Sequence, residues 1–178
     1  MVLRLLFAIV MLSVPFFALI AAQTHHGSHK GLAALIMSAA AGAIVAGPLW
    51  RMLNGLSHRT VMVVSCLIVS CSGAGLSIAY LMKLDQNVHI HAVALFAATV
   101  AASGLQTVRG LYFMDVAPKE QRVRAMTVAR SLGRTILVLV SAALAAIAHM
   151  HETVWVIVFI VCVCLVTSVL SYKLAGPQ

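Results

Sequence analysis

Charged residues are scarce in this chain. Only 9% of the 178 residues are Asp, Glu, Lys or Arg, against about 25% in a soluble domain. Four residues are acidic, and each is expected at a helix end or in a loop: Asp85, Asp115, Glu120 and Glu152. Hydrophobic residues make up 62% of the chain, more than a domain of this size can bury in one core. The composition excludes an ordinary soluble enzyme and indicates that the lipid bilayer is the solvent.

Motifs of the common enzyme classes are also missing. The sequence has no HExxH zinc motif, no phosphate-binding glycine loop and no paired carboxylates. A rhomboid-type protease needs Gly-x-Ser-Gly and a membrane histidine, but AASG at Ser103 lacks the first glycine. No carboxylate falls in the middle of an apolar run, so a proton relay is not evident. We therefore predict that the protein is not an enzyme and uses no cofactor.

The cysteines and histidines do not show the spacing of a defined metal site. Cys66 and Cys71 fall in one apolar run, and Cys162 and Cys164 fall in another, without a CxxC pair. We interpret them as small apolar side chains. The HHGSH segment at 25–29 offers two or three ligands for zinc or copper, and its protonation near pH 6 is an alternative role. Polar loop residues remain the simplest interpretation, so no metal site is predicted.

Long apolar runs dominate what the sequence does contain. A spanning helix needs about 20 apolar residues, and the chain has six such runs separated by charges, glycine, proline and histidine. We predict an all-α, polytopic membrane protein with one domain over 1–178. The expected spans lie at about 4–22, 31–53, 61–82, 91–112, 126–148 and 153–173. A cleaved signal peptide is the alternative for the first run and would leave the other five unchanged.

The basic residues are distributed unevenly between the two sides of the predicted membrane. With the N-terminus inside, ten of the 12 Lys and Arg residues fall on the cytoplasmic side, and only Lys30 and Lys83 fall outside. Short cytoplasmic loops are enriched in Lys and Arg. We therefore predict an integral protein of the plasma (inner) membrane with both termini cytoplasmic. The net charge of +8 then reports topology beside anionic headgroups, and no nucleic-acid partner is expected.

Polar residues recur at helical spacing in the fourth and fifth runs. Ser103 and Gln106 belong to a polar stripe in the fourth run, with Arg109 beside it. Arg134 and Ser141 lie on a broad polar face of the fifth run. A polar stripe that faces lipid is costly. We therefore expect both faces to turn toward protein or toward a water-filled cavity.

Arg134 is the residue of most interest on these faces. At ~1.5 Å per residue it lies about 21 Å from the outer end of its helix, inside the inner boundary of a core about 30 Å thick. One interpretation is that its side chain snorkels to the interface or pairs with an acid such as Asp115. The other is that it binds an anionic or polar substrate.

Small residues in the second run favour close packing of helices. Ser38 with Gly42, and Ala43 with Gly47, form small-xxx-small spacings, and Pro48 permits a bend. The third run carries Gly73 and Gly75, which allow close packing on one side. The sixth run is apolar on every side, which predicts a helix at the lipid-facing periphery.

Two segments resemble loops of the major facilitator superfamily. GPLWRMLNGLSHRTVMV, which starts at Gly47, is similar to the loop between the second and third helices of a six-helix half, with matches at Gly47, Gly55 and Arg59. Arg51 or Met52 stands where the family has its acidic residue, so that residue's charge-relay role is not implied. DVAPKEQRVRAMTVARSLGRTI resembles the loop before the eleventh helix, through residues of matching type: Pro118, Glu120, Arg122, Ala125, Ser131, Gly133 and Arg134.

The resemblance covers the whole chain and implies the C-terminal six-helix half of a transporter, built as a 3+3 inverted repeat. It implies movement of a small solute, by ion-coupled uptake or efflux, and pairing with a second six-helix half or a second copy. We expect Ser103, Gln106, Arg109 and Arg134 at the cavity or gate, and Gly47, Gly55 and Arg59 at the inner-loop motif. The alternative is a non-transporting accessory or relic protein that acts through helix–helix interaction.

Overall fold

The computed structural model describes residues 6, 9–25, 29–53, 58–84, 86–116, 122–150 and 153–174. Side chains at 58–59, 109–116, 122–130, 132 and 173–174 lie outside that description. The described helices are α2 (Ser13–Thr24), α3 (His29–Leu53), α4 (His58–Leu81), α5 (Val88–Val116), α6 (Arg122–Met150) and α7 (Thr153–Leu174). No strand occurs among the described residues, and the all-α prediction is confirmed.

Five of these helices are long and apolar enough to cross a membrane. The qualifying stretches are His29–Leu53, Thr60–Leu81, Val88–Val108, Gly133–Met150 and Thr153–Tyr172. The first apolar segment, Ile9–Thr24, is shorter. Helices of this kind satisfy every backbone polar group internally, which is what hydrocarbon requires of a spanning segment. The fold is that of a polytopic integral membrane protein.

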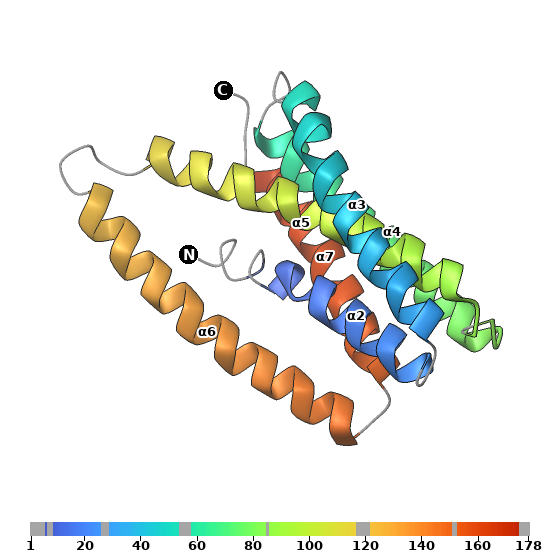
Figure 1. Ribbon diagram of the computed structural model, residues 1–178. Helices are drawn as coiled ribbons and strands as arrows, with labels where there is room; N and C mark the ends of the chain where they lie inside the picture. Colours follow the sequence, from blue (N-terminus) through green and yellow to red (C-terminus); the bar gives the residue numbers. More distant parts are fainter. Residues whose placement is uncertain are drawn as a thin grey trace.

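α3 and α5 pack side by side and run in the same direction (Figure 1). Ser38 donates a hydrogen bond to the Ala92 carbonyl, and a Cβ built on Gly42 would lie 3.0 Å from the Phe96 carbonyl oxygen. The contacts therefore advance by four residues on both helices. The expected small-residue packing is present at Ser38 and Gly42, where the missing side chain lets the two backbones approach.

The second small-residue pair of α3 behaves differently. Ala43 and Gly47 lie on the exposed side of the helix, and a Cβ on Gly47 would meet no heavy atom within 4 Å. The close packing expected at Ala43 and Gly47 is therefore not made within the described part of this chain. The physical reason is the helical period: positions one residue apart point about 100° apart, so the face that holds Gly42 cannot also hold Ala43.

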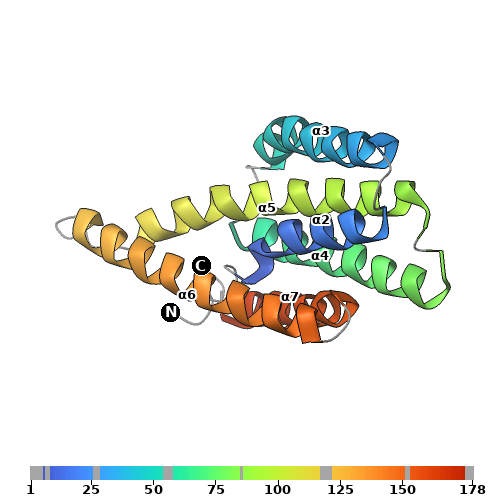
Figure 2. The same cartoon turned by 60° about the horizontal axis from the view of Figure 1, so that its bottom comes forward.

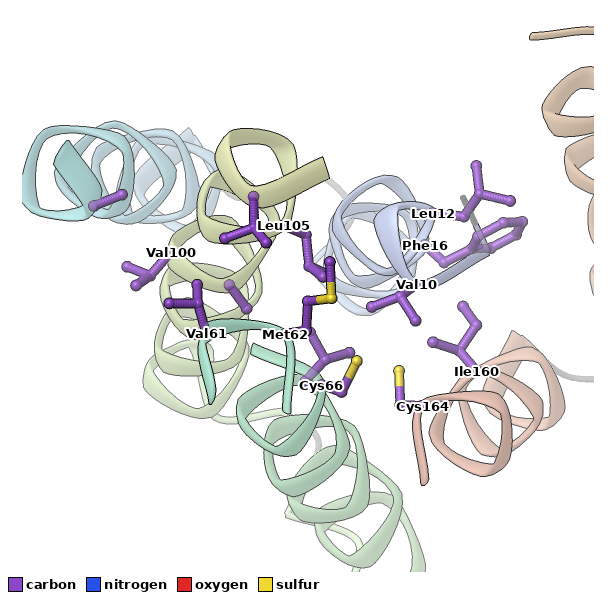
Figure 3. Close-up of a cluster of buried hydrophobic side chains, with 14 of the residues drawn as sticks. Val10, Leu12, Phe16, Val61, Met62, Cys66, Val100, Leu105, Ile160 and Cys164 are labelled. Atoms are coloured by element: carbon purple, nitrogen blue, oxygen red, sulfur yellow. The ribbon is translucent and has the colours of Figure 1, made fainter. Parts of the chain in front are cut away.

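α4 and α7 form the other main pair. Gly73 of α4 sits against Val161 of α7, with 2.5 Å between the position of a built Cβ and a Val161 methyl carbon. Cys66 and Cys164, both fully buried, face each other across the same interface (Figure 3). The pairing of later α4 residues with earlier α7 residues shows that the two helices are antiparallel. Close packing at Gly73 is as expected.

One face of α7 is buried, and the sequence, which predicted a helix at the lipid-facing periphery, did not indicate which face this would be. Val156, Ile160, Cys164 and Thr167 recur at three- and four-residue spacing and are fully covered. Trp155 and the remaining sides are exposed. Because every position from Val154 to Leu170 is apolar or small, the sequence holds no period that distinguishes the covered face from the exposed one.

α2 lies at the centre of the bundle, between α5 and the α4–α7 pair (Figure 2). Phe16 packs into one buried cluster with residues of α4, α5 and α7. Phe17 packs into a second cluster nearer the other end of the bundle. α6 stands apart from this arrangement (Figure 1), and its contacts are mainly with α7.

Candidate functional site

The polar stripe of α5 is built from hydroxyl groups that bond to their own helix. Thr99 donates to the Leu95 carbonyl at 2.8 Å, and Ser103 donates to the Thr99 carbonyl at 3.0 Å. Thr107 continues the series with a 3.0 Å bond to the Ser103 carbonyl. These hydroxyls are thereby satisfied without a partner from another helix. Their second lone pairs remain available to a ligand.

Gln106 lies beside this series, and its side chain is exposed. An amide group carries two donors and a carbonyl acceptor. Within the described part of the chain it has no hydrogen-bond partner. On a helix of membrane length, such a group needs a polar neighbour or water.

Arg134 lies on α6, and its side chain is exposed. It is the second residue of Gly133–Met150, the stretch of α6 that is long and apolar enough to span a membrane. Among the side chains that the structure describes, no ion pair or hydrogen bond joins it to another residue. Asp115, the acid named above as a possible partner, has a side chain outside the described set. Arg134 therefore presents five N–H donors on an uncovered helix face.

α6 buries a single narrow face. Leu144 is buried, and Leu137, Val140 and Ala148 pack partly against the same core cluster. These positions recur at three- and four-residue spacing, so they form one stripe along the helix. Arg134 comes three residues before Leu137 and continues this spacing toward the start of α6, yet its side chain is exposed within the part of the chain that the structure describes.

The predicted cavity residues are not brought into direct contact. Ser103 and Gln106 lie less than one turn apart on α5, and Arg134 lies on α6, with no hydrogen bond between the two helices at these described positions. Arg109 belongs to the α5 backbone, but its side chain lies outside the described residues. The assignment of these four residues to a cavity or gate stays a prediction.

The inner-loop motif is described only in part. Gly47 lies in α3 directly before Pro48, which sits inside the helix. Gly55 falls outside the described residues. Arg59 lies in the first turn of α4, and its side chain is likewise outside the description. A role for this motif as a hinge is untested by the geometry.

Sequence reasoning missed Trp50, which holds the C-terminal end of α3 against α5. Its indole Nε1 donates a 2.7 Å hydrogen bond to the buried Val100 carbonyl. The ring lies over Gly104, where a built Cβ would be only 2.3 Å from a ring carbon. A large aromatic residue at the same level as a glycine on the neighbouring apolar run is the signal that would have pointed to this contact.

Among the described residues, no group of three or more His, Cys, Asp or Glu side chains is placed to hold a metal ion. The four cysteines are free thiols: Cys66 and Cys164 are buried, and Cys71 and Cys162 are exposed. The polar groups available to a ligand on α5 and α6 are therefore hydroxyls, an amide and a guanidinium.

Comparison with known proteins identifies the chain's relatives. The sequence profile described as Major Facilitator Superfamily matches residues 2–177. An uncharacterized protein of Mycobacterium tuberculosis (strain ATCC 25618 / H37Rv) is 27% identical over 171 residues, which cover 95% of this chain and 32% of the relative. Uncharacterized proteins of Mycobacterium bovis and of a second M. tuberculosis strain match to the same extent. The chain thus spans about a third of the length of these curated relatives, and no solved structure matches significantly.

Proposed function

Because the chain belongs to the major facilitator superfamily, we propose that it supplies one six-helix half of a secondary transporter for a small solute. The family is one of membrane transporters, so a transporter-type function follows from membership. The solute class, the coupling and the second half are our own inference. In this fold class, substrate sites lie near the bilayer midplane between two repeats.

The observation that carries the proposal is the uncovered polar face of α6. Only 6% of its membrane-length stretch is buried within the chain, against 50% for α5. A face that holds Arg134 is costly to leave against lipid. A second six-helix half, or a second copy of this chain, would cover it and enclose a polar space between the two units.

α3 supports the same arrangement. Only 17% of its membrane-length stretch is buried, and its uncovered side combines small residues such as Ala43 and Gly47 with bulky Ile44 and Met52. Small residues allow the close approach of another helix. α3 and α6 together give the chain two helices with room for a partner.

We assign the solute to the polar or anionic class. Arg134 of α6 provides a cation, and Gln106 and Ser103 of α5 provide an amide and a hydroxyl lone pair. A guanidinium fork matches carboxylate and phosphate geometry. Coupling to an ion gradient, with both termini in the cytoplasm of the plasma (inner) membrane, completes the proposal. Lipid and solute are the expected partners besides the second half.

Cysteine accessibility tests the predicted cavity. In a background with the exposed Cys71 and Cys162 replaced by serine, Gln106→Cys and Arg134→Cys should react with a water-soluble maleimide. The matched control is Val169→Cys, an exposed position on the apolar helix α7. We expect fast labelling at 106 and 134 and slow labelling at 169. Labelling at 134 as slow as at 169 would show that no aqueous cavity reaches it.

Transport by reconstituted vesicles separates the proposal from the alternative of an accessory protein. The chain is reconstituted alone, and then together with a six-helix chain that co-purifies with it. Accumulation of a radiolabelled carboxylate or phosphate-bearing solute that is lost in Arg134→Gln supports transport. If positions 106 and 134 react with the maleimide but neither preparation moves solute, the result would instead favour an accessory role.

A further inference from the structure

Two buried histidines meet where α2 ends and α5 begins. His25 directly follows α2, and His91 lies in the first turn of α5. Figures 1 and 2 both show these helix ends side by side at one end of the bundle. The exposed fraction is 9% for His25 and 3% for His91. Two imidazole side chains are therefore enclosed at this end of the bundle.

The two imidazole rings are in edge contact. Their centroids are 5.2 Å apart, and their planes are inclined by 85°. The Nε2 atom of His25 is buried and makes no hydrogen bond within the described part of the chain. A buried polar atom of this kind calls for an explanation, because desolvation without a partner is costly.

The separation of the two rings fits two ligands of one metal ion. Two imidazoles on one tetrahedral zinc ion, with Zn–N bonds of about 2.0–2.1 Å, place their ring centroids about 5 Å apart. The observed separation of 5.2 Å matches this spacing.

We propose that His25 and His91 form a two-histidine site for a borderline divalent transition-metal ion, with zinc or copper as the occupant. Imidazole nitrogen suits these metals. The two protein ligands leave positions for water or another small donor. The bound ion ties the end of α2 to the start of α5. The site is independent of the transport proposal, since it lies at the end of the bundle and involves none of the predicted cavity residues.

Zinc competition against a chromogenic chelator tests the site on the full chain in detergent, with any affinity tag removed. We expect one zinc ion per chain. His25→Gln and His91→Gln should each weaken binding by about tenfold or more, the loss that removal of even an outer partner of a ligating histidine produces. The matched control is His89→Gln, two residues from His91 on the exposed side of the same helix end. It should leave the affinity unchanged.

Equal losses in all three variants would assign the zinc to surface histidines and overturn the proposal. A second variant, His91→Cys, keeps a metal ligand at the position. With cobalt as the probe, it should restore binding and add a thiolate-to-cobalt charge-transfer band. Failure of that band to appear in a folded protein would also contradict the site.

Copper spectroscopy uses the unaltered chain, so its result does not depend on whether a variant folds. One equivalent of Cu²⁺ should give an electron paramagnetic resonance spectrum with splitting from imidazole nitrogens. The spectrum of the free aqueous ion would overturn the proposal. The chain could instead bind neither metal and show a pH-dependent change in unfolding that requires both histidines. This result would identify the pair as a proton-binding contact and would refute metal binding.

Discussion

At the scale of single residues, the contact between Trp50 and Gly104 sets the distance between α3 and α5. The indole ring occupies the space that any side chain at 104 would need. The ring is large and rigid, and its Nε1 atom is held by the Val100 carbonyl. The position therefore tolerates glycine and nothing larger, although alanine is the better helix former.

Gly104→Ala should destabilise the protein. The new methyl group would lie 2.3 Å from a ring carbon of Trp50, so the ring must shift and its hydrogen bond must lengthen or break. Overpacking of a buried contact typically costs about 1–3 kcal/mol. Gly47→Ala is the control, because a Cβ there meets nothing within 4 Å and alanine gains roughly 0.5–1 kcal/mol in a helix. Unfolding by denaturant in detergent micelles compares the two, and a Gly104→Ala protein as stable as Gly47→Ala would refute the contact.

At the scale of helices, close approach of α4 to its neighbours depends on Gly73. A Cβ there would lie 2.5 Å from a Val161 methyl carbon and 3.3 Å from the ring of Phe17. One glycine thus lets α7 and α2 approach α4 at the same level. Small residues play this part in membrane helices because lipid supplies no hydrophobic force to bring helices together.

Gly73→Val should push α7 away from α4 and lower stability by about 1–3 kcal/mol. Gly75→Val offers a control on the same helix, since a Cβ at 75 meets no heavy atom within 4 Å. Both substitutions introduce the same β-branched residue, so the difference between them isolates the packing effect. Thermal unfolding followed by helical circular dichroism measures it. Equal midpoints for the two variants would contradict the antiparallel α4–α7 pairing at Gly73.

The helices themselves could be predicted from the sequence, but which face of each helix is buried could not. Apolar runs of about 20 residues leave a helix as the available structure in lipid. The Ser38–Gly42 spacing also correctly indicated packing. Ala43 and Gly47 carry the same spacing one residue further on, and only the position of α5 decides which pair is covered. In α7, uniform apolar character hid the buried face, and the Trp50–Gly104 contact joins residues 54 positions apart, beyond the reach of local patterns.

At the scale of the whole molecule, the asymmetry between covered and uncovered helices matters more than any single contact. α4, α5 and α7 surround α2 and make a packed core, whereas α3 and α6 each keep one side free. The uncovered side of α6 carries Arg134 and Ser131 in its first half and apolar Val138 and Leu139 further along. A helix with a polar first half and an apolar second half fits an interface that admits water at one end and excludes it at the other.

The membrane topology of the chain decides which end of that interface faces the cytoplasm. Ten of the 12 basic residues predict that the connections around 54–57 and 117–121 are cytoplasmic and that the turn at Lys83 is outside. In intact cells, an impermeant maleimide should label Leu84→Cys, an exposed position in that turn. Lys119→Cys should react only after the membrane is permeabilised. Both variants need the background that lacks the native exposed Cys71 and Cys162. Labelling of Lys119→Cys in intact cells would contradict the predicted topology, because it would place the start of α6, and Arg134 with it, near the outer surface.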